Sequence, residues 1–84
     1  MLDEILEAVR KGYNVKFSEV PVHHKLHDYN LRIEVTDGYH HEARDISPIT
    51  IGDSRRQFED TVCWTLSELI NRMDVYQMIK EVLQ

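Results

Sequence analysis

Five histidines and one cysteine are the side chains of this 84-residue chain with the most distinctive chemistry. The histidines are His23, His24, His27, His40 and His41. Imidazoles at short spacing bind zinc or copper when they converge on one point. No second thiolate completes such a set, since Cys63 is the only cysteine. We therefore predict no metal site and no cofactor, and whether His23, His24 and His27 meet a metal stays open.

Catalytic motifs are the next feature to look for, because the chain contains a thiol, serines, histidines and carboxylates. A nucleophile needs an adjacent base and a third group that orients the base. The chain contains no nucleophile elbow, phosphate loop or metalloprotease pairing that would place these groups together. We therefore predict that the protein is not an enzyme.

Two arginines, Arg55 and Arg56, fall at the start of a predicted helix, where cations oppose the helix dipole. Two interpretations stay open. The arginines form an anion or phosphate site together with the free amides of the helix N-terminus. Alternatively, they pair locally with Asp53, Glu59 or Asp60.

Trp64 lies on the polar side of the same predicted helix, away from its apolar stripe. An exposed tryptophan is a good anchor for a protein interface. The alternative is that another helix covers it, and the sequence does not decide between the two.

Composition limits the remaining function classes. The chain is 42% hydrophobic and 30% charged with a net charge of −5, which is typical of a soluble globular protein. We expect a single domain over residues 1–84. No apolar run approaches the roughly 20 residues that span a bilayer, so we predict no membrane partner. The acidic start and the single cysteine predict a cytoplasmic protein without a secretory signal. The charge disfavours nucleic acid and favours a basic partner surface.

Hydrophobic spacing predicts a helix followed by strands in the first half of the chain. Leu2, Ile5, Leu6 and Val9 recur at helical spacing, and Gly12 follows where a helix stop belongs. From Tyr13 the period changes to two, which predicts a strand that ends near Pro21. Residues 22–28 show no period and are expected to form a loop. A second strand follows from Tyr29 to Thr36.

Asp37-Gly38 predicts a hairpin turn between the second and third strands. We expect a three-residue loop, Thr36 to Gly38, with a left-handed glycine at a bulge. The resulting apolar pairs are Val35 with Tyr39, Ile33 with His41 and Leu31 with Ala43. The polar pairs on the other face are Glu34 with His40 and Arg32 with Glu42. This register avoids burying a charged row beside an apolar one.

The second half of the chain is predicted to be mostly helical. Pro48 and residues 49–51 indicate an extended crossing or a short edge strand, and residues 52–54 supply a helix start. The apolar stripe of this helix is Phe58, Val62, Leu66, Leu69, Ile70 and Met73. Asp74 begins a third helix with the stripe Val75, Met78, Ile79, Val82 and Leu83, or else one helix continues. The fold is therefore predicted as α+β, with a three-stranded antiparallel sheet, helices on one of its faces and the order α-β-β-β-α(-α).

Two families resemble this pattern. The element order is similar to that of double-stranded-RNA-binding domains, and Ser54-Arg55-Arg56 stands where that family places basic residues. The first half also resembles small phage-encoded anti-CRISPR inhibitors of the type II RNA-guided nuclease. Their amphipathic first helix, their strand of the Tyr13–Ser18 kind and their strand ending in Asp-Gly are all matched here. That likeness implies that residues around Asp37, Gly38 and Glu42 mimic DNA phosphates.

These observations lead to a hypothesis of function. We expect a small, non-enzymatic protein-binding module, a phage-encoded inhibitor that acts by occupying a partner surface. The expected partner-binding residues are Asp37, Gly38, Tyr39, His40, Glu42 and Trp64, and the expected anion-binding residues are Arg55 and Arg56. The alternatives are a nucleic-acid-binding domain of double-stranded-RNA-binding-like topology and a structural homo-oligomer built through the C-terminal helix.

Overall fold

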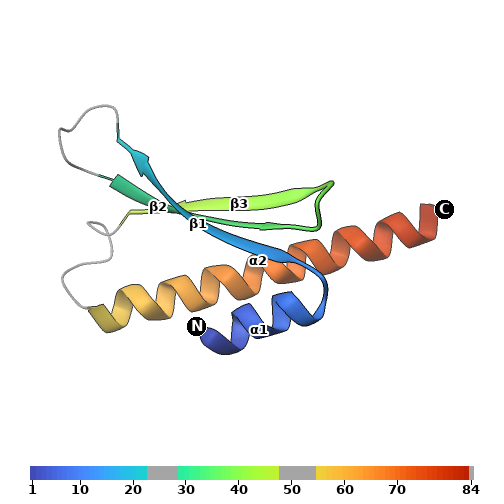
Figure 1. The fold of residues 1–84 in the computed structure, drawn as a ribbon, viewed down its shortest axis with the longest axis horizontal. Helices are drawn as coiled ribbons and strands as arrows, with labels where there is room; N and C mark the ends of the chain where they lie inside the picture. Colours follow the sequence, from blue (N-terminus) through green and yellow to red (C-terminus); the bar gives the residue numbers. More distant parts are fainter. Residues whose placement is uncertain (23–28, 48–54, 84) are drawn as a thin grey trace.

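A short helix, three strands and one long helix make up the protein in the computed structural model, which describes residues 1–22, 29–47 and 55–83 (Figure 1). The elements are α1 (Leu2–Arg10), β1 (Asn14–Pro21), β2 (Tyr29–Thr36), β3 (His41–Ile46) and α2 (Arg55–Leu83). The strands form one antiparallel sheet in the order β1-β2-β3. The predicted α+β class and element order are confirmed. The loop around His23, His24 and His27, the strand at 49–51 and the helix start at 52–54 lie outside the described residues.

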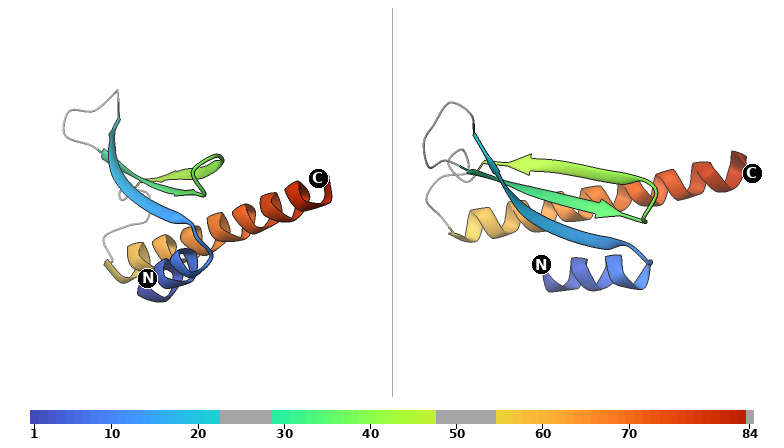
Figure 2. Two further views of the ribbon diagram at one scale, coloured as in Figure 1. Left: turned by 45° about the vertical axis from the view of Figure 1, so that its right-hand side comes forward. Right: turned by 45° about the horizontal axis from the view of Figure 1, so that its top comes forward.

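Both helices lie on the same side of the sheet (Figure 2). Helix α2 packs against β2 and β3 and continues beyond the hairpin end of the sheet, while α1 packs against β1 and α2. Helix α1 ends at Arg10, and Gly12 follows two residues later with a φ of +83°, the left-handed conformation expected where a helix stops. None of the described helices is long and apolar enough to cross a membrane.

The core lies between the sheet and α2. Its buried side chains are Ala8, Tyr13, Ile33, Val35, Ile46, Val62, Leu66, Leu69, Ile70 and Met73. Five of the six residues of the predicted α2 stripe are among them, and the sixth, Phe58, packs partly buried against the cluster. That prediction is confirmed, because residues at helical spacing share one face of the helix.

Helix α2 continues without a break through Asp74, so of the two alternatives that the sequence left open, one continuous helix is the correct one. Asp74 does not cap a helix start. Its carboxylate instead accepts hydrogen bonds from the Tyr13 hydroxyl at 2.7 Å and from the Lys11 ammonium at 2.6 Å. A residue type that favours helix starts is used here for a tertiary contact to the segment that joins α1 and β1.

The hairpin register differs from the prediction. Thr36 pairs with His41, so the loop has four residues, Asp37 to His40, rather than three. Gly38 has the expected left-handed backbone, with a φ of +99°. The longer loop is closed by side chains. The Asp37 carboxylate accepts hydrogen bonds from the Tyr39 and His40 amides at 2.9 and 2.8 Å, and the Thr36 hydroxyl donates to the His40 carbonyl at 2.8 Å.

This register reverses the faces of β3 relative to the prediction. Glu42 lies opposite Val35 and Arg44 opposite Ile33, on the helix side of the sheet. The predicted desolvation cost does not arise, because both side chains remain partly exposed and both are paired. Arg44 makes two hydrogen bonds to Glu68 of α2, at 2.6 and 2.8 Å.

The predicted polar cross-strand pairs are therefore wrong. Glu42 bonds His40 at 3.0 Å, and Arg32 bonds Asp45 at 2.8 and 3.1 Å on the open face of the sheet. The open face also carries Ala43, which the prediction had placed on the apolar side.

Candidate functional site

Exposed apolar side chains are the most informative feature of the surface. Among the described residues, thirteen large hydrophobic side chains are exposed, whereas the buried core contains ten residues. Single exposed hydrophobic residues are normal, but contiguous groups of them mark interaction sites. The position of these side chains on the elements therefore bears directly on function.

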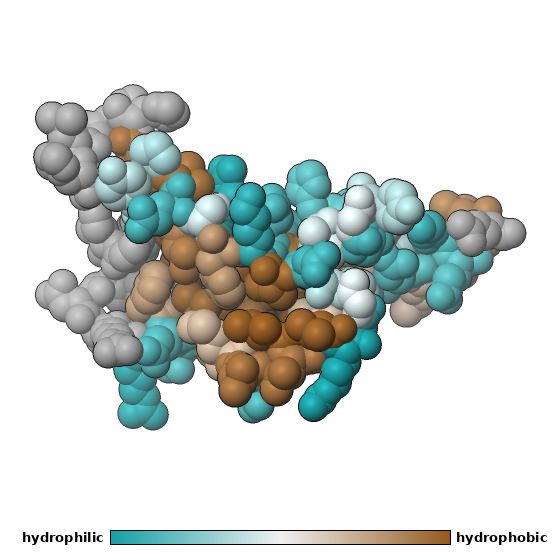
Figure 3. Space-filling view, viewed as in Figure 1, coloured by the Kyte–Doolittle hydropathy of each residue, from teal (hydrophilic) through white to brown (hydrophobic). Residues whose placement is uncertain are grey.

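One such group lies on α1 and the edge of β1. Ala8 is the only buried residue of α1, whereas Leu2, Leu6 and Val9 are 67, 40 and 60% exposed. Phe17 of β1, which lies on the helix side of the sheet opposite Ile33, is 39% exposed. Figure 3 shows the hydrophobic residues gathered over α1 and the neighbouring part of β1. We refer to Leu2, Leu6, Val9 and Phe17 as the α1 face.

The first helix was expected to cover the apolar side of the sheet, and it does so only in part. Ile5 packs partly buried against the core, and Ala8 is fully buried. The rest of the apolar stripe is turned away from the core, because α1 lies beside α2 rather than between α2 and the sheet (Figure 1).

Polar contacts hold α1 in place. Besides the bond to Asp74, the Lys11 ammonium lies 3.0 Å from the Glu7 carboxylate. Burial, together with the bond to Asp74, raises the pKa of Tyr13 to about 12. Burial alone would raise the pKa of Asp74, but the hydrogen bonds from Lys11 and Tyr13 outweigh it and lower that pKa below its usual value. The junction therefore favours an ionised carboxylate and a neutral phenol.

The hairpin tip carries most of the predicted partner-binding residues. Tyr39 is 90% exposed, and the Lys80 ammonium lies 5.5 Å from the centre of its ring. The resemblance implied that the Asp37 carboxylate mimics a DNA phosphate, but in the structure this carboxylate accepts hydrogen bonds within the turn. Hydrogen bonds from the His40 and Tyr39 amides hold its pKa at about 2, and its other oxygen accepts a hydrogen bond from Gln77 of α2. Its carboxylate is thus committed to closing the turn.

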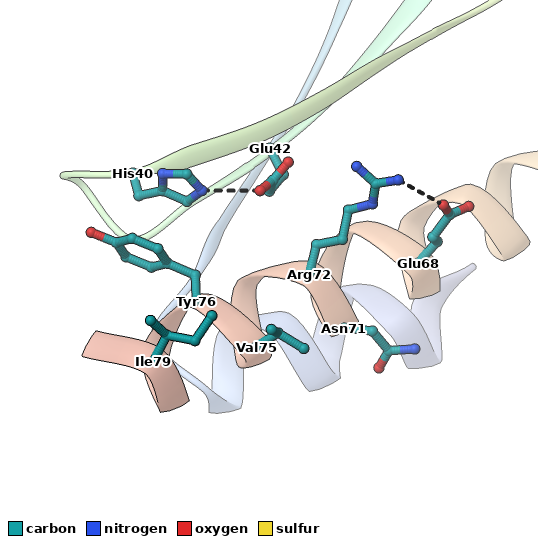
Figure 4. A pocket seen from close by; sticks show the side chains of 8 residues that line it. All are labelled: His40, Glu42, Glu68, Asn71, Arg72, Val75, Tyr76 and Ile79. Atoms are coloured by element: carbon teal, nitrogen blue, oxygen red, sulfur yellow. Dashed lines mark hydrogen bonds and ion pairs between the residues drawn. The ribbon is translucent and has the colours of Figure 1, made fainter. Parts of the chain in front are cut away.

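A groove lies beside β3, between the hairpin and the outer flank of α2 (Figure 4). Its volume is about 450 Å³. It is lined by His40, Glu42, Glu68, Asn71, Arg72, Val75, Tyr76 and Ile79. At one end the His40 ring stacks on the Tyr76 ring, with centroids 4.0 Å apart and an angle of 13° between the planes. Sequence reasoning missed Tyr76, because only the register of the hairpin brings His40 over it.

The predicted site residues do not form one surface. Trp64 is 64% exposed, which confirms the interpretation that it is uncovered. It lies twelve residues before Tyr76 on α2, about 18 Å along the helix axis at the usual rise, so it is separate from the hairpin tip. Arg56 is exposed in the first turn of α2, and the side chain of Arg55 lies outside the described part of the chain.

No group of three or more His, Cys, Asp or Glu side chains in the described ranges is arranged to hold a metal ion. His41 is exposed on the open face of the sheet, whereas His40 bonds Glu42 in the groove on the helix side. Cys63 is a partly buried free cysteine on α2.

No family model, no curated protein and no solved structure matches this chain at a significant level.

Proposed function

We propose that this protein is a binding module that docks onto another protein through the α1 face. One observation carries the proposal: α1 buries a single residue and leaves Leu2 and Val9 at least 60% exposed. Keeping such side chains in water is unfavourable by about 25 cal/mol for each Å² of apolar surface, so a partner that covers them gains affinity. The fold holds this face rigidly through the Lys11, Tyr13 and Asp74 junction.

The charge around this face indicates the kind of partner. The first two turns of α1 carry Asp3, Glu4 and Glu7, and the chain as a whole has a net charge of −5. Complementary charge speeds encounter and disfavours wrong partners. The occupant that fits is a protein that presents an apolar ridge bordered by lysine or arginine.

Nucleic-acid binding receives less support. Of the cations that this alternative would use, Arg32 is bonded to Asp45, while Lys16 and Arg56 are exposed; Arg44, elsewhere on the sheet, is bonded to Glu68. Lys11 is likewise paired with two carboxylates. Phosphate binding would have to compete with these contacts against an unfavourable net charge.

The test is capture of host proteins with chemical cross-linking and mass spectrometry, comparing wild type with Val9→Lys, Val9→Glu and the control Val82→Lys. Val82 is 79% exposed at the far end of α2, so its substitution changes the charge equally without touching the α1 face. We expect one protein to cross-link to α1 in wild type and in the control, less strongly in Val9→Glu, and least in Val9→Lys. Equal capture by all four proteins, or cross-links confined to another face, would overturn the proposal.

A narrower role, inhibition of a type II RNA-guided nuclease by a phage-encoded protein, follows from the resemblance of the first half of the chain. We propose that such inhibition would act through the α1 face rather than through Asp37, whose carboxylate closes the turn. The assay is DNA cleavage by the purified nuclease with wild type and with Val9→Lys. Full cleavage in the presence of excess wild-type protein would remove this role and leave the broader proposal standing.

A further inference from the structure

Strand β3 is an outer strand of the sheet. It pairs with β2 on one side and with no other described strand. The Asp37 amide donates to the His40 carbonyl at 3.2 Å, so this pair occupies a hydrogen-bonded position of the ladder, with the His40 amide donating to the Asp37 carboxylate instead of its carbonyl. Such pairs alternate along an antiparallel ladder. The backbone N–H and C=O groups of His41, Ala43 and Asp45 therefore point to the outer edge.

The side chains along this edge are arranged symmetrically about Ala43. Glu42 and Arg44 stand one residue to either side of Ala43, and His41 and Asp45 stand two residues to either side. If two such strands pair antiparallel with Ala43 opposite Ala43, each carboxylate faces a cation or an imidazole of the other strand. Opposite charges directly across a strand pair are stabilising, and like charges are destabilising.

We propose that β3 pairs antiparallel with β3 of a second copy of this chain, about a two-fold axis at Ala43, so that the two sheets become one. The outward backbone groups of His41 then bond those of Asp45 in the other copy, and Ala43 bonds Ala43. The same patch is used on both copies, as a two-fold interface requires. Edge strands with free backbone groups are otherwise open to uncontrolled pairing, which this arrangement prevents.

The groove beside β3 supplies the rest of the interface. A stable dimer buries about 800 Å² on each partner, more than one short strand provides. Val75 and Ile79, which line the groove from α2, are 52 and 53% exposed. Because α2 lies under β2 and β3 (Figure 2), joining the sheets at β3 brings the outer flanks of the two α2 helices toward each other. In this register His40 lies opposite Ile46 of the other strand, so the groove of each copy, at the hairpin end, faces the N-terminal half of the other copy's α2 rather than the other groove.

An unrelated extended peptide would also find free backbone groups at this edge. It would have no reason to match the order of charges along β3, whereas a second copy matches it from His41 to Asp45. The self-complementary pattern therefore favours the same chain as occupant. The α1 face lies at the β1 end of the sheet, so the dimer leaves it open on both copies, and this inference does not depend on the proposed function.

The first test is the molar mass of the full chain by sedimentation equilibrium, for wild type and Ala43→Pro. Proline at position 43 removes an N–H that points outward and leaves the ladder with β2 intact. We expect a dimer for wild type, and for Ala43→Pro a monomer with an unchanged circular dichroism spectrum. A monomeric wild type at millimolar concentration, or a folded Ala43→Pro variant that dimerises as wild type does, would overturn the proposal.

A charge test at His41 covers the case in which Ala43→Pro does not fold. His41 is exposed, and within the described residues its side chain makes no hydrogen bond or ion pair that a replacement would remove. His41→Asp places a carboxylate opposite Asp45 of the other copy, twice in each dimer, whereas His41→Lys places a cation there. From the size of cross-strand pair energies we expect His41→Asp to weaken dimerisation by about ten-fold and His41→Lys to leave it equal or tighter. Equal dissociation constants for the two variants would contradict the register.

Disulfide cross-linking locates the axis directly. In a hydrogen-bonded antiparallel pair the two Cα atoms are about 5.5 Å apart, within the range that a disulfide spans. In a Cys63→Ala background we expect Ala43→Cys to form a covalent dimer on mild oxidation, and Lys16→Cys, on the opposite edge of the sheet, to remain monomeric under the same conditions. Equal yields from the two variants would contradict the axis. Adding Val9→Lys to the Ala43→Cys variant should not change the yield of covalent dimer. The dimer can therefore be tested independently of the proposed docking through the α1 face.

Discussion

The junction of Tyr13, Lys11 and Asp74 allows a quantitative prediction, because a single carboxylate holds α1 against α2. Asp74→Ala leaves the Tyr13 hydroxyl without a partner, and the Tyr13 side chain is only 6% exposed. A buried polar group that loses its partner costs about 1–3 kcal/mol. The contact to Lys11 is about one third exposed and adds about 0–1 kcal/mol. We expect Asp74→Ala to lower the free energy of unfolding by about 2 kcal/mol.

For a domain of this length, about 2 kcal/mol corresponds to a fall of roughly 10 °C in Tm. Tyr13→Phe removes the hydroxyl itself, so in that background Asp74→Ala should cost only the contact to Lys11. A double-mutant cycle in urea should therefore give a coupling energy of about 1–1.5 kcal/mol between the two residues. Additivity of the two substitutions within about 0.5 kcal/mol would refute this account of the junction.

Hydrogen exchange provides the second readout. Since α1 buries only Ala8, loss of the junction should release α1 before it affects the sheet. In Asp74→Ala we expect faster exchange of the amides of residues 5–10 and unchanged protection in β2. Uniformly faster exchange would show that Asp74 supports the whole domain rather than the attachment of α1.

Three further predictions concern pH and packing. The pKa of Tyr13 is raised from 10.0 to about 12, so the stability that its neutral phenol contributes is present below pH 10 and is lost as the pH rises toward 12. A tyrosine absorbance titration should show one component at high pH that is absent in Tyr13→Phe. The pKa of Asp37 is lowered from 3.8 to about 2, so the stability that its carboxylate contributes is present above pH 3.8 and is lost as the pH falls toward 2. NMR of the carboxyl group should show a titration midpoint of about 2. Asp37→Asn should make the stability depend less on pH in this range. Leu66→Ala should cost about 2–5 kcal/mol in urea unfolding, whereas Leu83→Ala, at a position 81% exposed, should change stability by less than about 0.5 kcal/mol.

The elements themselves could be predicted because their causes are local. Apolar residues at helical spacing placed one side of α2 in the core, and a period of two marked the strands. Gly12 and Gly38 were expected to be left-handed, and both have a positive φ. In each case the physical cause acts within a few residues, so the sequence pattern contains it.

The hairpin register could not be predicted, since its causes are not local. The predicted register avoided a charged row beside an apolar one, whereas Arg44 lies opposite Ile33 and pairs with Glu68, twenty-four residues later on α2. A buried charge is costly only without a partner. The partner became visible only when α2 was placed beneath β3. The observed register also places Glu42 in the groove, and it directs the backbone groups of His41, Ala43 and Asp45 to the outer edge of the sheet.

By itself, the sequence determined the element order, the core stripe of α2 and the position of the turn, because backbone geometry and apolar spacing act over short distances. Only the tertiary structure decided which residues remain exposed. The spacing of Leu2, Leu6 and Val9 is typical of residues that face a core. In the structure α1 lies beside α2, and no described element covers these three side chains. Exposure depends on where every other element lies, and that is why the α1 face, rather than the Asp37-Gly38 turn, became the surface proposed for docking.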